Sequence, residues 1–147
     1  WAAGLVLLQI VGSGMLWKNY FTTFPREQSD SFQYALAQTM QYVHDNEKFY
    51  TSVVFSNEGA LYQSYMFFLY YSKMDPRQYF SYGGTVSGGY AQSHAIGKYS
   101  FRRIETHELL TPGVLYVYDA KSVPANATVI QTFANNDGRA SVALVTL

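Results

Sequence analysis

Residues 1–17 form an apolar run without a charged side chain, and the first charge of the chain is Lys18. A helix needs roughly 20 apolar residues to cross the hydrocarbon core of a bilayer, so this run is slightly short of a full span. Trp17 and Tyr20 lie at its polar end, where aromatic side chains of membrane helices meet water. We therefore interpret residues 1–18 as the end of a transmembrane helix and residues 19–147 as a water-exposed domain.

Two other interpretations of the apolar run stay open. The same composition suits a helix buried in a protein core or the apolar region of a signal peptide. A signal peptide would also have a basic region before the run and an Ala-x-Ala cleavage site in the right place, and the sequence has neither. Because the chain does not begin with Met, we expect it to be cut from a longer protein.

The charge and cysteine content exclude several classes of function. Ten basic and ten acidic side chains give a formal net charge of zero, without a run of either sign. Nothing in this balance favours electrostatic capture of nucleic acid or of an anionic membrane surface. Cysteine is absent, which excludes disulfides, zinc–thiolate sites and thiol nucleophiles and fits an extracytoplasmic bacterial setting.

The pattern of apolar residues predicts a single α/β domain with a mixed β-sheet and flanking helices. Residues 19–27 contain a proline and no helical stripe, so we expect an extended connector there. Ser29 is the expected N-cap of the first helix, Asp75-Pro76 is expected to end the second, and the Gly-rich segment 79–98 is expected to be a long loop. Helices are predicted at residues 29–44 and 58–73, and strands at 51–55, 99–104, 114–118, 128–133 and 140–145.

Asn136-Asp137-Gly138 separates the last two predicted strands. Glycine supplies the positive φ that tight turns need, so this tripeptide predicts a hairpin. The antiparallel hairpin and the preceding β-α-β order together indicate a sheet with both parallel and antiparallel neighbours.

Motifs for common catalytic and cofactor chemistry are missing. The three histidines, His44, His94 and His107, lack the spacing that directs two imidazoles at one metal ion. The chain has no P-loop, no dinucleotide-binding glycine pattern after a strand and no G-x-S-x-G nucleophile elbow. Asn126-Ala-Thr128 matches an N-glycosylation sequon and indicates an exposed turn.

Several short motifs occur together in the expected order of elements. They are Tyr20-Phe21 and Phe24-Pro25, the strand Val53-Val54-Phe55, Tyr65-x-x-Phe68-x-x-Tyr71, Asp75-Pro76-x-x-Tyr79, and Asp137-Gly138. Over most of residues 1–147 this arrangement resembles the bacterial group of dolichyl-phosphate-mannose protein mannosyltransferases and aminoarabinose transferases. The chain departs from that group at Phe24, where the family has Tyr, and at Phe80, where a polar residue is common.

The resemblance implies a polytopic membrane glycosyltransferase that moves a sugar from a polyprenyl-phosphate carrier to an extracytoplasmic acceptor. It would place residues 19–147 on the extracytoplasmic side of the cell membrane. The catalytic carboxylate of the family lies in an early loop among its membrane helices, so we expect no catalytic residue, metal or cofactor within this chain. The expected partners are the membrane, the remaining transmembrane part of the same protein or a membrane complex, and a lipid-linked sugar.

On the same resemblance, four residues near the Gly-rich segment are candidates for contacts with a sugar, by stacking and hydrogen bonding. They are Asp75, Tyr79, Tyr82 and Tyr90. Their alternative role is helix termination and core packing.

Two further hypotheses belong to other classes of protein. The chain would be a membrane-anchored, non-catalytic accessory or docking subunit of a larger complex, or a soluble α/β ligand-binding domain whose N-terminal stretch lies in its core. A reading frame with many further membrane spans before Trp1 favours the enzyme, and one with only one or two spans favours the accessory subunit.

Overall fold

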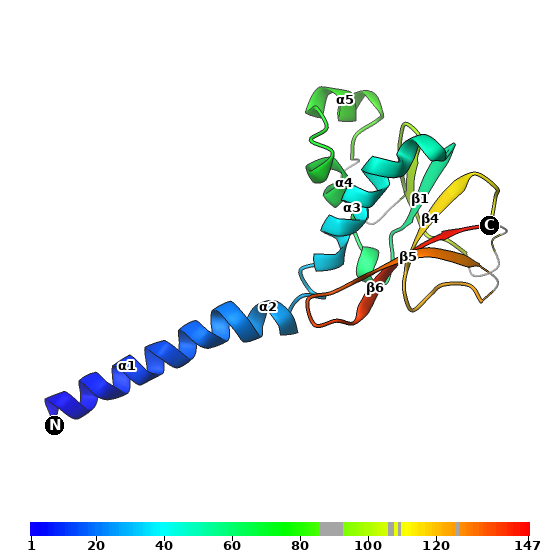
Figure 1. The fold of residues 1–147 in the computed structure, drawn as a ribbon. Helices are drawn as coiled ribbons and strands as arrows, with labels where there is room; N and C mark the ends of the chain where they lie inside the picture. The colour runs from blue at the N-terminus through cyan, green and yellow to red at the C-terminus, as the bar shows by residue number, and fades with distance from the viewer. Residues whose placement is uncertain (86–92, 106–107, 109, 126) are drawn as a thin grey trace.

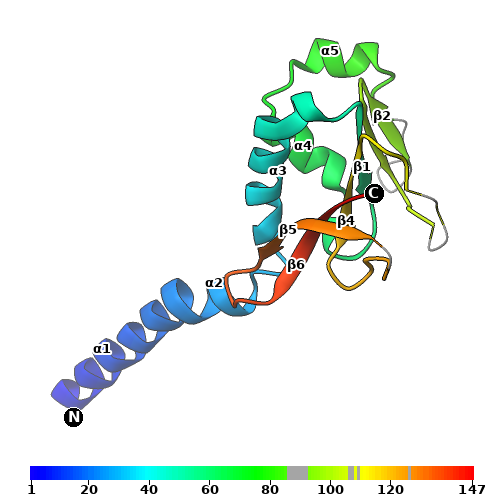
Figure 2. The same ribbon diagram turned by 45° about the vertical axis from the view of Figure 1, so that its right-hand side comes forward.

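The computed structural model describes residues 1–85, 93–105, 108, 110–125 and 127–147, and it shows a helical rod that leads into an α/β domain (Figure 1). The rod consists of α1 (Ala2–Lys18), a π-helical turn (Asn19–Thr23) and α2 (Phe24–Glu27). It projects away from the domain in both views (Figure 2).

The domain is built on one six-stranded mixed sheet. Its strand order is β2-β3-β1-β4-β6-β5, with β1 parallel to both β3 and β4 and with antiparallel pairs at both ends. This confirms the predicted α/β class. In chain order the elements are α3 (Tyr34–Asn46), β1 (Ser52–Ser56), α4 (Ser64–Tyr71), α5 (Pro76–Ser81), β2 (His94–Ile96), β3 (Tyr99–Arg102), β4 (Val114–Asp119), β5 (Thr128–Ala134) and β6 (Ala140–Thr146), with short 3₁₀ helices at Glu47–Phe49 and Gly59–Leu61.

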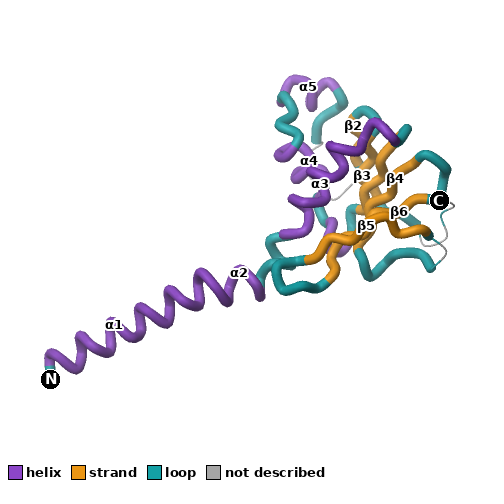
Figure 3. Tube along the Cα trace, in the orientation of Figure 1, coloured by secondary structure: helices purple, strands orange, loops and turns teal. Residues whose placement is uncertain are grey.

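The two faces of the sheet are covered in different ways. Helices α3 and α4 pack on one face, which Figure 3 shows as a purple layer beside the orange strands. Successive side chains of a strand point to opposite faces, so Val53 and Phe55 join the helix-covered cluster while Val54 joins the other. On that second face Tyr116 and Tyr118 lie under loop residues, including Val123. Burial on both faces explains why β1 and β4 are almost continuously apolar.

Aromatic rings fill the space between α4 and the sheet. The ring of Phe68 lies 5.4 Å from that of Phe101 and 4.3 Å from that of Tyr99, measured between centroids. Phe55 stacks on Phe101 at 5.0 Å. Each aromatic side chain buries a large apolar area, so this cluster contributes strongly to the packing of α4 against the sheet.

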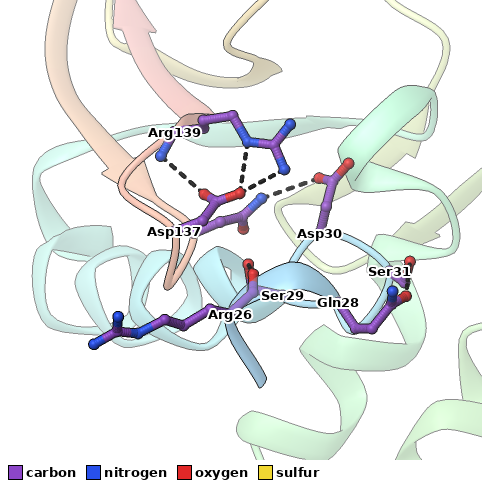
Figure 4. Close-up of polar contacts among 8 residues, drawn as sticks. Arg26, Gln28, Ser29, Asp30, Ser31, Asp137 and Arg139 are labelled. Carbon is purple, nitrogen blue, oxygen red and sulfur yellow. Dashed lines mark hydrogen bonds and ion pairs between the residues drawn. The ribbon is translucent and has the colours of Figure 1, made fainter. Parts of the chain in front are cut away.

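The rod meets the domain at the turn between β5 and β6. Asn135 donates a hydrogen bond from Nδ2 to Oδ1 of Asp30 at 3.0 Å, and Arg139 lies beside it, paired with Asp137 at 2.5 Å (Figure 4). Gly138 has a φ of 85°, so the predicted hairpin turn is confirmed. The last part of the chain therefore fixes the segment that follows α2.

Residues 19–27 are helical, and the prediction of an extended connector is wrong. Pro25 lies in the first turn of α2, where the missing backbone N–H of proline costs little. Thr22 donates from Oγ1 to the carbonyl oxygen of Lys18 at 2.5 Å, which keeps the π-helical turn continuous with α1. The proline therefore begins a helical turn in this segment.

The first predicted helix of the domain begins five residues later than expected. Ser29 does not cap it, because its hydroxyl donates to the carbonyl oxygen of Arg26 at 2.8 Å. Helix α3 starts at Tyr34, after Gln33 in a left-handed conformation with φ of 50°. The hydrogen bond of Asp30 to the distant hairpin outweighs the local helical pattern of residues 29–33.

The segment predicted as one helix over residues 58–73 is interrupted. A 3₁₀ turn comes first, Gln63 then takes a left-handed φ of 58°, and α4 begins at Ser64. Two tertiary hydrogen bonds explain the break: Ala60 N–H donates to Asp119 at 2.9 Å, and the Ser64 hydroxyl donates to the carbonyl oxygen of Ser56 at 3.1 Å.

The single long loop predicted for residues 79–98 is also wrong. Asp75-Pro76 ends one helix and starts the next, α5, with Asp75 as its N-cap. Residues 94–96 form β2 and pair with β3. The glycines of the predicted loop at positions 88 and 89 lie outside the described residues.

Among the described residues, no helix combines the length and the apolar character that a membrane crossing requires. Helix α1 has no buried residue, which contradicts the interpretation of residues 1–17 as a core helix of this chain.

The aromatic cluster under α4 leads to a stability prediction. Phe68 is 7% exposed, so Phe68→Ala leaves a cavity and lowers the free energy of unfolding by about 3–5 kcal/mol. Phe80 in α5 is 71% exposed, and Phe80→Ala is the matched control with an effect below about 0.5 kcal/mol. Urea denaturation in detergent micelles measures both. Equal losses in the two variants would show that the cluster does not hold α4 in place.

Candidate functional site

Three parallel strands, β3, β1 and β4, end at the same edge of the sheet. In open α/β sheets, ligands bind in the crevice outside the carboxyl ends of parallel strands. Here β1 ends at Ser56, β3 at Arg102 and β4 at Asp119. A binding site is therefore expected at the loops that follow these three strand ends.

A pocket of about 560 Å³ lies at this edge, and we call it the strand-end pocket. Loops that follow all three strands contribute to it, so residues more than 60 positions apart meet there. Its polar lining is Ser56, Glu58, Arg103, Asp119, Lys121 and Ser122, and Ile104, Val123 and Pro124 are part of its apolar lining.

Asp119 connects the loop after β1 to the end of β4. Its Oδ2 accepts a hydrogen bond from Ala60 N–H and its Oδ1 accepts one from Lys121 N–H, both at 2.9 Å. Gly59 has a φ of 58°, and a Cβ at this position would lie 2.2 Å from Oδ2 of Asp119. Only glycine leaves room for the carboxylate, so this close approach fixes both the side chain and the loop.

The exposed charges of the pocket are held less firmly. Arg103 Nε lies 3.4 Å from Oε1 of Glu58 and 3.7 Å from Oε1 of Glu105. All three side chains are more than half exposed, and ion pairs in that setting contribute little to stability. The Arg103 and Glu58 side chains are consequently available to reorient toward a ligand.

At the end of β3, Arg102 forms two charged hydrogen bonds with Glu108, at 2.7 and 2.6 Å. The hydrogen bond from Arg102 holds the pKa of Glu108 below its usual value, and the same bond raises the pKa of Arg102. The pair thus stays ionised and fixes the loop after β3 against the sheet.

Tyr118 forms part of the pocket wall from β4. Burial raises the pKa of its phenol, and the negative charge of Glu108 raises it further. The hydroxyl is buried and has no hydrogen-bond partner among the described residues. Buried polar groups are usually paired, so the Tyr118 hydroxyl has unused hydrogen-bonding capacity at the pocket wall.

The strand-end pocket combines polar side chains with an apolar wall. Within the described ranges, no group of three or more His, Asp or Glu side chains is arranged to hold a metal ion. The pocket supplies hydrogen-bond donors and acceptors on rigid strand ends, together with an apolar wall.

The residues predicted from the sequence as sugar contacts lie elsewhere. Asp75 caps α5 by accepting from Arg77 N–H at 2.7 Å, and Tyr79 packs against the core while its hydroxyl bonds to Thr85. Tyr82 lies against the turn at Gly97, since a Cβ there would be 3.7 Å from its hydroxyl. These three residues lie in or at the ends of α5, and Tyr82 lies near the turn that leads into β3. Tyr90 lies outside the described residues.

Sequence reasoning missed the strand-end pocket, although a signal for it was present. Glu58 and Asp119 lie just after the predicted strands 51–55 and 114–118, and Arg103 is the penultimate residue of the predicted strand 99–104. Parallel neighbours were predicted, but the order β3-β1-β4 was not, so these residues were not expected to meet at one edge.

The close approach of Gly59 to Asp119 leads to a prediction with a matched control. Gly59→Ala places a methyl group in a left-handed residue and displaces Asp119, so we expect a loss of about 2–4 kcal/mol in the free energy of unfolding. Gly97 has nearly the same φ, 59°, with its nearest neighbour at 3.7 Å, so Gly97→Ala should cost only about 1–2 kcal/mol. Chemical denaturation of both variants measures the difference. Identical losses would mean that the Asp119 contact adds nothing beyond the backbone conformation.

Comparisons with known proteins add no family assignment to this geometry. Models of protein families, curated proteins and solved structures all gave no match to the chain. The features of the chain that bear on its function are the exposed apolar helix α1, the strand-end pocket and the short sequence motifs.

Proposed function

We propose that this chain is the membrane-attached domain of a larger membrane protein, with α1 embedded in lipid and the sheet in water. The observation that supports this most is the exposure of α1. Its large apolar side chains between Leu5 and Leu16 are 51–73% exposed. A helix that is apolar on all sides belongs in a membrane or in the interior of a large assembly. Water alone is a poor environment for so much contiguous apolar surface.

The residues that follow α1 fit the polar boundary of a membrane. Trp17, Tyr20, Phe21 and Phe24 are all exposed and contact one another, with Trp17 and Phe21 at 5.3 Å between ring centroids. Aromatic rings of this kind concentrate at the lipid headgroups. Lys18 provides the first charge at the same level. An apolar helix followed by exposed aromatic residues is typical of a domain anchored to a membrane.

Within this proposal, the full protein is a glycosyltransferase that uses a polyprenyl-phosphate-linked sugar, and residues 19–147 form its extracytoplasmic C-terminal domain. The support is the set of motifs shared with the mannosyltransferase and aminoarabinose transferase group. Two of them have clear local roles here, since Asp75-Pro76 caps α5 and Asp137-Gly138 forms the hairpin turn. Catalysis would lie in the membrane part of the protein, with this domain beside the acceptor.

A non-catalytic docking subunit is the second candidate. Gly4, Gly12 and Gly14 have no other atom within 4 Å of a Cβ built on them, so α1 has open surface beside its small residues. Small residues let membrane helices approach one another closely. A helix of this kind suits packing against further spans of a complex as well as against spans of the same chain.

Vesicle binding tests the membrane proposal. A Lys at the middle of an apolar helix costs about 3 kcal/mol of insertion free energy relative to Val, so Val11→Lys should weaken vesicle partitioning by about 100-fold. Flotation with phosphatidylethanolamine and phosphatidylglycerol vesicles, over a range of lipid concentrations, measures the partition coefficient.

The matched control is Val129→Lys in the edge strand β5. Val129 is 46% exposed and Val11 is 51% exposed, so the two variants change charge and apolar surface by similar amounts. The control should partition like the unaltered chain. If the unaltered chain fails to float, or if both variants lose binding equally, α1 is not the membrane anchor.

The transferase part of the proposal is tested in the full-length protein. If Tyr82 contacts the sugar acceptor, Tyr82→Ala should lower the rate of sugar transfer from a polyprenyl-phosphate donor about five- to tenfold, the loss of one hydrogen bond. Tyr70→Ala, at an exposed tyrosine of α4, is the control and should keep the full rate. A full rate in both variants removes α5 from the acceptor site, and no transfer in the unaltered protein favours the docking subunit.

A further inference from the structure

We infer that the strand-end pocket is a binding site for a neutral, hydroxyl-rich ligand, a saccharide of one or two rings. This inference deepens the proposed transferase function, on which the choice of a sugar rests, and the pocket itself is formed entirely by the sheet and its loops. Four features of the pocket support a saccharide ligand: the fixed carboxylate of Asp119, the balance of charges, the apolar wall and the position of the pocket.

The carboxylate of Asp119, a hydrogen-bond acceptor in the pocket lining, is held in place without a ligand. Both carboxylate oxygens of Asp119 accept one backbone N–H each, and the close contact at Gly59 prevents the side chain from moving toward that loop. Each oxygen keeps a further lone pair for a ligand hydroxyl. Binding therefore costs little ordering at this residue.

The charges of the pocket balance. Glu58 and Asp119 oppose Arg103 and Lys121, so the lining has no net charge that would favour a phosphate, a nucleotide or a polyamine. A hydroxyl group is both a donor and an acceptor. Several hydroxyls on one ring can satisfy carboxylates and cations together, which a purely anionic or cationic ligand cannot do.

One side of the pocket is apolar. Ile104, Val123 and Pro124 form it, beside the buried ring of Tyr118. A sugar ring has a C–H face that can rest on such a wall while its hydroxyls reach the charged side. The volume of about 560 Å³ lies within the range of small-molecule sites, about 300–1,000 Å³.

The pocket opens at the edge of the sheet that is nearer to the rod. Asp119 pairs with Val142 near the start of β6, and β6 follows the turn whose Asn135 bonds to Asp30. Figures 1 and 2 both show this turn beside the end of α2. A saccharide presented near a membrane surface would meet this edge first if α1 is embedded in lipid.

Ligand-observed saturation-transfer NMR on the full chain tests the inference. The chain is held in micelles of a detergent without a sugar headgroup, and the sugar probes are mannose, glucose, galactose and N-acetylglucosamine. Inorganic phosphate, which has no carbon-bound protons, is the fifth probe and is followed by the broadening of its ³¹P signal. At least one sugar should give a saturating signal at millimolar concentration. In Glu58→Gln and in Lys121→Gln its affinity should fall at least fivefold. Both side chains are exposed, so the fold persists.

Lys48→Gln is the control, because Lys48 is exposed and absent from the pocket lining. It should bind the sugar as the unaltered chain does. The inference is overturned if no sugar saturates, if the pocket variants bind as well as the control, or if phosphate alone binds and loses its signal in Lys121→Gln. Vesicles are absent from this assay, so its failure is distinct from a failure of membrane attachment.

Discussion

The pairing of β1 with two parallel neighbours is the constraint on which the rest of the domain depends. Parallel strands need crossover connections, and here the connection from β1 to β3 places α4 over one face. It also aligns the ends of β3, β1 and β4, so the loops after Ser56, Arg102 and Asp119 converge. Burial of β1 on both faces and the strand-end pocket are two consequences of the same topology.

The sequence predicted the parts of this fold that depend on local pattern. The apolar residues 51–55 and 114–118 lie in the two central strands, and Asn136-Asp137-Gly138 forms the expected turn. The failures occur where a long-range contact competes with a local preference. Asp30 bonds to Asn135, and Ala60 bonds to Asp119, 59 residues away, so helices expected at both places begin late. No local window contains both partners of such bonds.

Proline produced a different kind of error. Pro25 and Pro76 were both taken as helix breakers, yet each lies in the first turn of a helix. Proline lacks the N–H that a helix interior needs, but the first turn leaves that N–H unpaired in any case. Asp75 directly before Pro76 is a local signal for a helix start, whereas the N-cap before Pro25, Thr23, makes no side-chain capping bond. The strand-end pocket escaped prediction because strand order is not encoded in any single segment of the sequence.

The rod and the domain differ in how much of their apolar surface is buried within the chain. The domain has two buried apolar clusters of its own, whereas α1 has no buried residue. The contact between Asp30 and the β5–β6 turn links the two parts, and it does so at the edge where the parallel strands also end. Whatever covers α1 therefore also determines what approaches that edge. If lipid surrounds α1, the strand-end pocket faces water and lipid headgroups. Its lining has equal numbers of acidic and basic side chains, so it attracts neither anions nor cations strongly, and its hydrogen-bonding groups suit a polar boundary of this kind.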